Sequence, residues 1–302
     1  MSDIPQAYIL VGPTASGKSS VAQFLAEQTG APVVSADSMN IYRGMDIGTA
    51  KPTAAERGTV QYSGIDLADP TDPFSVGDWL AAVRPAFQCL ENKMCGGSVS
   101  PIVAGGTGLY VKCLLAGLDP MPIADEALRV RAKKMSLAAL QTEARSVAPE
   151  AYEVLSDKEN PRRLVRLIEN RGAPRTQKKE LPAVIGFHVE REVLLKRIAA
   201  RIDQMYANGL IEEARGLIGL ELSVTAQKAI GYAEAFAVLR GEMSEAQAKE
   251  RTIIRTRQLA KRQMTWFRTQ LNVEWIDTAK FQTLEELAVE VSNVWKKVPV
   301  AL

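Results

Sequence analysis

The fold class follows from one stretch, Gly12-Pro13-Thr14-Ala15-Ser16-Gly17-Lys18-Ser19. It matches the phosphate-binding pattern G-x-x-x-x-G-K-S/T at every fixed position. The apolar run at 7–11 indicates a buried strand, and apolar residues at helical spacing after the stretch indicate a helix that ends at Gly30. Strand, glycine loop and helix in this order are the context that a P-loop requires. The alternative is a glycine-rich turn with a chance lysine, which would not need that context.

All eight residues of this stretch are candidate ligands of a diphosphate or a triphosphate. The glycines allow backbone N–H groups to converge on an anion, and the N-terminus of the helix adds a partial positive charge. Lys18 supplies a full charge to the terminal phosphate. The hydroxyl of Ser19 can hold Mg²⁺, the one cofactor that we expect.

The composition is that of a soluble globular protein: of 302 residues, 46% are apolar and 24% are charged, and the net charge is +2. No run of about eighteen apolar residues occurs, so we expect no membrane segment. Because a strand is predicted to begin near residue 7, we expect no signal or transit peptide. The three cysteines have no metal-type spacing and favour a reducing compartment, so we expect a cytoplasmic protein.

Further apolar runs predict an α/β fold with a parallel sheet. The run 32–36 ends at Asp37, and the run 101–104 ends in the glycine-rich turn 105–110. Because the carboxyl ends of parallel strands line the ligand crevice, we expect Asp37 and this turn to lie beside the P-loop. A glycine-rich turn alone could equally be a tight connection. The other predicted elements are strands at 62–67, 183–187 and 273–276 and a helix at 76–90.

The pattern becomes helical at 119–180, with predicted helices at 128–147 and 151–170. This segment holds thirteen Lys or Arg residues against ten Asp or Glu residues. We interpret it as a helical insertion that divides the P-loop core into 1–118 and 181–302, although charge alone is also compatible with a solvated helical face.

A second basic segment, 251–270, holds six basic residues and no acidic residue. At helical spacing Ile253, Ala260 and Phe267 form one apolar stripe, and the basic side chains occupy the other faces. A helix with one packing face and cationic faces suits a polyanion.

Six motifs occur in one order along the chain: 12–19 (GPTASGKS), Asp37-Ser38 with Tyr42-Arg43, 47–52 (IGTAKP), 105–110 (GGTGLY), 229–232 (AIGY) and 256–268 (TRQLAKRQMTWFR). Together they resemble the tRNA dimethylallyltransferases over nearly the whole chain. The resemblance implies transfer of a dimethylallyl group from its diphosphate to N6 of the adenosine 3′ of the tRNA anticodon. It also implies a P-loop kinase-like fold whose insertion grips the anticodon arm, and a monomer agrees with a chain that encloses its own partner.

The resemblance also assigns roles. Asp37 resembles the family's general base, although a magnesium ligand or a strand-end cap is the alternative. Thr107 and Arg201 resemble residues that contact the diphosphate and act in catalysis. The expected tRNA contacts are Asp37, Ser38, Met39, Asn40, Thr107, Arg129, Arg162, Arg163, Arg166, Lys228, Gly231, Tyr232, Arg257, Lys261 and Arg262. The family usually has Gln at the position of Asn40, so this chain departs from its pattern where the target base is contacted.

Two other functions fit part of the sequence. A small-molecule P-loop kinase would bind ATP at the loop, but it leaves the basic segment 251–270 unexplained. An RNA-binding protein switched by nucleotide would explain the charge, but it leaves Asp37 and the two glycine loops around one crevice unexplained. Both would turn over ATP, whereas the transferase would not need it.

Overall fold

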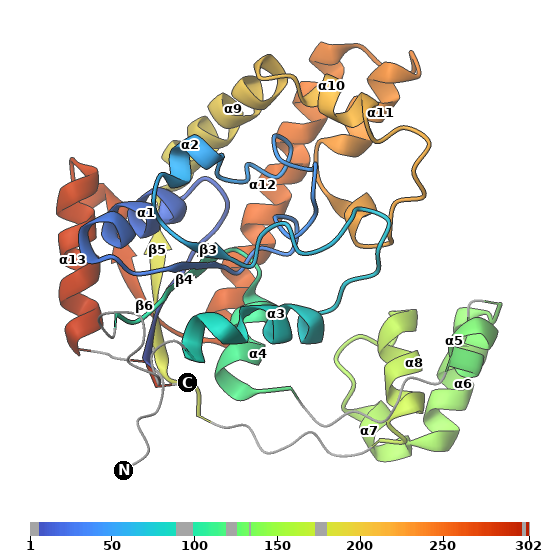
Figure 1. Ribbon diagram of the computed structural model, residues 1–302. Helices are drawn as coiled ribbons and strands as arrows, with labels where there is room; N and C mark the ends of the chain where they lie inside the picture. Colours follow the sequence, from blue (N-terminus) through green and yellow to red (C-terminus); the bar gives the residue numbers. More distant parts are fainter. Residues whose placement is uncertain are drawn as a thin grey trace. The chain divides into compact units, whose positions relative to one another are not determined.

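The computed structural model describes residues 6–88, 99–118, 126–132, 134–172, 180–297 and 300–301 (Figure 1). The chain divides into two compact units, one formed by Met1–Ala116 with Leu181–Leu302 and the other by Gly117–Glu180. The second unit begins two residues before the insertion predicted at 119–180 and ends with it. Within the described residues, no helix is both long enough and apolar enough to span a bilayer.

The first unit is built on a parallel sheet with the strand order β3-β2-β4-β1-β5-β6. The strands are β1 (Gln6–Val11), β2 (Val33–Ser35), β3 (Tyr62–Ser63), β4 (Ile102–Gly105), β5 (Ala183–His188) and β6 (Asn272–Asp277), and β7 (Val300–Ala301) pairs antiparallel with β1. Val11 pairs with Gly105, and Ser35 pairs with Ala104. The phosphate loop, Asp37 and the turn after β4 therefore follow three adjacent strand ends. The predicted α/β class is confirmed.

Helices cover both faces of this sheet (Figure 1). The helices of the first unit are α1 (Lys18–Thr29), α2 (Ala54–Arg57), α3 (Val76–Gln88), α4 (Gly108–Ala116), α9 (Arg191–Ala207), α10 (Leu210–Arg215), α11 (Tyr232–Leu239), α12 (Glu245–Gln270) and α13 (Leu284–Lys297), with short 3-10 helices at Ala226–Lys228 and Thr278–Lys280. Strand side chains alternate between the two faces. Leu10 packs with Val291 of α13, whereas Ile9 lies in the opposite core with Trp79 of α3 and Phe267 of α12. Both faces are buried, as parallel sheets require.

The second unit is helical and has a core of its own, in which Leu140, Tyr152 and Leu164 are buried. Its helices are α5 (Glu126–Ala132), α6 (Leu137–Val147), α7 (Pro149–Glu153) and α8 (Pro161–Glu169). The two long helices predicted here, 128–147 and 151–170, were wrong. Ser136 starts a new helix by accepting a hydrogen bond from the Ala139 N–H at 3.2 Å. Pro161 starts another, because proline suits the first helical turn and not the interior.

The third strand of the sheet is also shorter than predicted. We expected 62–67, whereas β3 ends at Ser63. The backbone then turns through positive φ angles, 82° at Gly64 and 53° at Asp66, which a strand does not contain. The helix predicted at 76–90 is present over 76–88, and its last two residues lie outside the described part of the chain.

Candidate active site

The phosphate loop connects β1 to α1 through two residues in the left-handed region. Ala15 has a φ of 62° and Gly17 a φ of 90°. No side chain caps the first turn of α1, so its N–H groups remain available to an anion. The hydroxyl of Ser16 is buried in the loop without a hydrogen-bond partner among the described residues. The loop thus offers donors that a bound phosphate would satisfy.

Positive charge gathers at this loop from two helices. Lys18 of α1 is 8% exposed, and its Nζ donates to the Pro13 carbonyl at 3.3 Å. Burial lowers the Lys18 pKa to about 8, while Asp37 opposes this shift and Arg201 adds to it. Arg201 of α9 reaches Thr14 Oγ1 at 3.5 Å, and burial lowers its pKa against the attraction of Asp37. Three of the predicted site residues, Lys18, Asp37 and Arg201, are therefore close enough to influence one another.

A second arginine of α9 reaches the loop and was not predicted. Arg197 donates to the Ser16 carbonyl at 3.5 Å, one helical turn before Arg201. Residues four apart lie on the same face of a helix, so the spacing of Arg197 and Arg201 was the available signal.

Asp37 and Thr107 come together at the ends of β2 and β4. Asp37 Oδ1 accepts a hydrogen bond from the Met39 N–H at 2.9 Å. Its Oδ2 has no hydrogen bond within the described part of the chain and remains available to a ligand. Thr107 Oγ1 accepts from the Ser38 N–H at 2.9 Å and lies 3.2 Å from Ser38 Oγ, to which it donates. The turn at 105–110 thus holds the segment that carries Asp37.

Other residues predicted to bind tRNA are buried. Asn40 donates to Ser35 Oγ at 3.4 Å, and its Oδ1 has no partner among the described residues. Tyr232 is 2% exposed, and its hydroxyl donates to Glu213 Oε1 at 2.6 Å. The Glu213 carboxylate also accepts the backbone N–H groups of 46–48 at 2.8–3.1 Å. A direct contact of Tyr232 with tRNA stays a prediction, and one that would require this side chain to leave its buried place.

Gly231 likewise has an internal role. Its N–H donates to Glu234 Oε2 at 3.1 Å, and Glu234 is 2% exposed. Arg255 of α12 neutralises this buried carboxylate at 2.6 Å. Part of the predicted cationic face of 251–270 is therefore used inside the protein.

Two models of known families match the chain. Residues 40–270 match the model described as IPP transferase, and residues 5–62 match the one described as isopentenyl transferase. The chain belongs to the IPP transferase family.

Relatives of this IPP transferase include a tRNA dimethylallyltransferase of Stenotrophomonas maltophilia strain R551-3. It is 37% identical over 313 residues, which cover 96% of this chain and 97% of that protein. The solved tRNA isopentenylpyrophosphate transferase of Bacillus halodurans is 32% identical, covers 97% of both chains and gives a TM-score of 0.70. A eukaryotic dimethylallyltransferase acting on tRNA gives a TM-score of 0.80 over 98% of this chain. At 20% identity, that structure supports the fold alone.

The other predicted tRNA contacts are Lys and Arg residues, most of them exposed and some already paired. On α12, Arg257, Lys261 and Arg262 are exposed and form no ion pair with any described residue. On α8, Arg162 and Arg166 are exposed, while Arg163 donates to Ser156 Oγ at 2.6 Å. The predicted tRNA contacts also include Arg129, which is paired with Glu169 at 2.6 Å, and Lys228, which is exposed.

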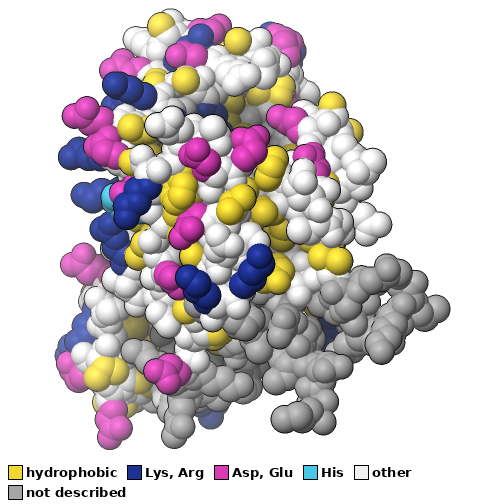
Figure 2. Space-filling model, turned by 90° about the vertical axis from the view of Figure 1, so that its left-hand side faces the viewer, with side chains coloured by type: hydrophobic (Ala, Val, Ile, Leu, Met, Phe, Trp, Pro, Cys, Tyr) yellow, Lys and Arg dark blue, Asp and Glu magenta, His cyan; other side chains and the backbone are white. Residues whose placement is uncertain are grey.

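Charges of both signs are mixed on one face of the protein. On the face drawn in Figure 2, Lys and Arg side chains lie among Asp and Glu side chains, with apolar areas between them. This mixture agrees with the net charge of +2, and it gives that face no broad cationic area. The exposed cations of α12 and α8 are thus better candidates for a polyanion than the mixed charges of that face.

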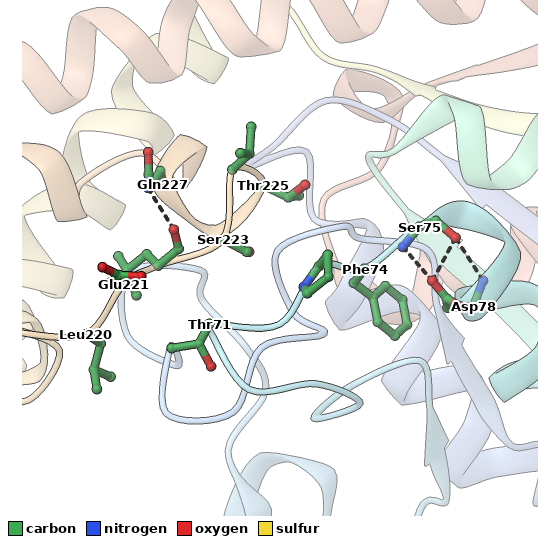
Figure 3. Close-up of a pocket in the computed structure, with 12 residues that line it drawn as sticks. Thr71, Phe74, Ser75, Asp78, Leu220, Glu221, Ser223, Thr225 and Gln227 are labelled. Carbon is green, nitrogen blue, oxygen red and sulfur yellow. Dashed lines mark hydrogen bonds between the residues drawn. The ribbon is translucent and has the colours of Figure 1, made fainter. Parts of the chain in front are cut away.

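A groove of about 960 Å³ lies between the segments 71–78 and 220–227 of the first unit (Figure 3). Asp78 and Glu221 are among its lining residues, which include no Lys or Arg. Asp78 accepts the hydroxyl of Ser75 at 2.7 Å. The acidic lining does not suit a diphosphate, and no motif in the sequence indicated this groove.

The residues present fit a particular kind of magnesium site. No group of three or more His, Cys, Asp or Glu side chains converges within the described ranges, so they contain no cage for a divalent ion. Ser19 is exposed in the first turn of α1. Magnesium ions commonly take most of their ligands from substrate phosphates and water, which suits a site with one protein hydroxyl.

Proposed function

We propose that this enzyme transfers a dimethylallyl group from dimethylallyl diphosphate to N6 of the adenosine 3′ of the anticodon in tRNA and releases pyrophosphate. The observation that carries the proposal is the meeting of Asp37 with Lys18 and Arg201 at the phosphate loop of an IPP transferase. One carboxylate that can accept a proton and two cationic side chains suit a reaction in which a proton is removed and a diphosphate departs.

In the reaction the allylic C1–O bond breaks and the C1–N6 bond forms. The bonding electrons leave with pyrophosphate, so negative charge increases on the departing oxygen. The loop N–H groups, Lys18 and Arg201 stabilise that charge. Because Lys18 is buried, its charge acts in a medium less polar than water, where an electrostatic contact is stronger.

The adenine N6 is a poor nucleophile because its lone pair is delocalised into the ring. Asp37 corrects this by accepting an N6–H hydrogen bond and then the proton. Its Oδ1 already accepts the Met39 N–H, which fixes the carboxylate and leaves Oδ2 to accept the N6–H of adenine. Thr107 holds Ser38 and is proposed to contact the diphosphate from the same turn.

Magnesium belongs to this proposal with Ser19 as its protein ligand. When bound, the ion would neutralise charge on the diphosphate.

The anticodon arm of tRNA binds the exposed arginines of α8 and the cations of α12. The enzyme acts in the cytoplasm. It acts as a monomer, because one chain carries the groups for both substrates.

The test is incubation of the purified chain with unmodified tRNA and labelled dimethylallyl diphosphate, and separately with ATP. We expect label in tRNA without ATP, and pyrophosphate in equal amount. ATP turnover without transfer of label would instead favour a P-loop kinase or a nucleotide-switched RNA-binding protein. Labelling of a tRNA that lacks the adenosine 3′ of the anticodon would contradict the proposed acceptor.

A further inference from the structure

The side-chain amide of Gln263, on α12, joins the two glycine loops of the site. Its Oε1 accepts the backbone N–H of Thr14 at 2.9 Å, and its Nε2 donates to the Gly106 carbonyl at 3.0 Å. Thr14 lies in the phosphate loop, and Gly106 precedes Thr107 in the turn after β4. One side chain thus contacts both segments that are proposed to bind the diphosphate.

The packing around Gln263 shows that the helix sits directly on this turn. A Cβ atom at residue 106 would overlap the amide nitrogen of Gln263, and a Cβ atom at residue 108 would overlap the ring of Trp266. Both positions are glycine, so α12 approaches closer than any other residue would allow. The hydrogen bonds are therefore part of a fitted contact between α12 and the turn.

The same helix carries exposed cations just before this contact in the sequence. Arg257, Lys261 and Arg262 lie within six residues of Gln263 and have no ion pair among the described residues. A polyanion bound to them would act on the same rigid helix that holds the Thr14 N–H. That N–H belongs to the loop whose amides receive the diphosphate.

We propose that Gln263 is a positioning residue that couples the tRNA-binding helix α12 to the phosphate loop, so that each substrate alters the affinity of the enzyme for the other. The inference rests on the proposed function, since it takes tRNA to bind α12. Gln263 acts through Thr14 and Gly106 and touches neither reacting atom. Coupling of this kind is reciprocal, so either substrate can be used to measure it.

The experiment measures the dissociation constant of labelled pyrophosphate for the full chain, with and without saturating unmodified tRNA. In the wild type we expect tRNA to change this constant by about five-fold or more, which is the lower range of typical coupling. Gln263→Met keeps the length of the side chain and removes both hydrogen bonds, so the ratio should approach one. Gln258→Met is the matched control, because Gln258 is exposed on the same helix, and it should keep the wild-type ratio.

A purely structural role would reduce the melting temperature and leave the ratio unchanged. Gln263→Glu is the second variant if Gln263→Met fails to fold. It keeps an acceptor for the Thr14 N–H and loses the donor to Gly106, so the ratio should fall part of the way. A wild-type ratio near one, or a Gln263 variant that keeps the full ratio, would overturn the inference. Absence of prenyl transfer by the wild type would instead refute the proposed function, and the two failures are therefore distinguishable.

Discussion

Lys18 gives the phosphate loop a charge that depends on pH. Burial brings its pKa to about 8, so the free protein loses this positive charge as the pH rises above that value. Binding of dimethylallyl diphosphate favours the charged form, and above pH 8 it must therefore take up a proton. We expect the affinity to be constant below about pH 7.5 and to fall about ten-fold per pH unit above 8.

The measurement is the dissociation constant of dimethylallyl diphosphate without tRNA, from pH 6.5 to 9.5. Lys18→Arg is the control, because a guanidinium stays protonated over this range and the pH dependence should disappear. The two proteins are compared by the slope of log affinity against pH, since the arginine can change the absolute affinity by its size. An unchanged wild-type affinity up to pH 9.5 would exclude a titrating Lys18 from the diphosphate site.

The proposed general-base role of Asp37 can be tested with one substitution of the same shape. Asp37→Asn keeps an oxygen for the Met39 N–H and for N6–H, but it cannot take a proton. We expect kcat to fall about 10²–10⁴-fold, the usual contribution of a general base. The diphosphate should bind nearly as before, because Asp37 carries charge of the same sign as the ligand.

Single-turnover transfer at saturating substrates, with a magnesium titration and a melting curve, separates this role from its alternatives. A magnesium ligand would lose diphosphate affinity on substitution, and added Mg²⁺ would restore part of the activity. A strand-end cap would lose about 1 kcal/mol of stability with little change in rate. Rescue by Mg²⁺, or a rate within a few-fold of the wild type, would remove the base role from Asp37.

At the residue scale, the sequence predicted groups that follow strand ends and missed groups whose partners come from distant helices. Lys18, Asp37 and Thr107 each lie on the segment that follows a strand revealed by its apolar run, so the rule that ligands bind at the carboxyl ends of parallel strands placed them together. Gln263 and Glu213 contact loops more than 150 residues away in the chain, and only packing determines such partners. The buried place of Tyr232 was not predicted for the same reason, since its ring fills space beside Gly48.

At the scale of elements, five of the six parallel strands and α12 were predicted because apolar runs mark strands and helical spacing marks a helix. The strand expected at 62–67 is the exception, since β3 ends at Ser63. The helices of the second unit were joined in error. Ser136 and Pro161 are ordinary start signals, but apolar residues continue at helical spacing across both. Local capping therefore outweighed periodicity at two positions where both signals could be seen.

The contact between α12 and α4 gives a prediction about stability. Gly108→Ala would place a methyl group against the ring of Trp266. Overpacking usually costs about 1–3 kcal/mol, which exceeds the gain of at most about 1 kcal/mol from replacing glycine in a helix. We expect the free energy of unfolding to fall by about 1–2 kcal/mol in a denaturant titration.

Gly216→Ala is the matched control for this substitution. The φ of Gly216 is −64°, and a Cβ atom there would meet its nearest neighbour, the Glu213 carbonyl oxygen, at 3.4 Å. Alanine at such a site often stabilises by about 0.4–1 kcal/mol, because it restricts the unfolded chain. A Gly108→Ala protein as stable as the wild type would show that Trp266 can yield and that the fit of α12 on the turn is loose.

At the scale of the whole molecule, the net charge is small although exposed cations are concentrated on individual helices. With a net charge of +2, long-range attraction to a polyanion is weak, so binding depends on where unpaired cations lie. Some exposed cations already pair with carboxylates: Arg215 pairs with Glu212 and Arg240 pairs with Glu242. The exposed groups of α8 and α12 belong to different compact units, and each can be tested separately.

The affinity for tRNA should therefore fall steeply with salt, through contacts in both units. Each phosphate contact contributes a log–log slope of about −0.7 on single strands and about −0.9 on duplex, so the six cations of α8 and α12 give roughly −4 to −5.5. Replacing Arg257, Lys261 and Arg262 by Gln should flatten the slope by about 2–3, and replacing Arg162, Arg163 and Arg166 should do the same.

Filter binding of unmodified tRNA between low and moderate salt measures this slope. The control is Arg215→Gln/Arg240→Gln, because both arginines already have carboxylate partners. If one triple variant keeps the wild-type slope, its element does not contact tRNA phosphates. A wild-type slope near zero would remove that role from both elements.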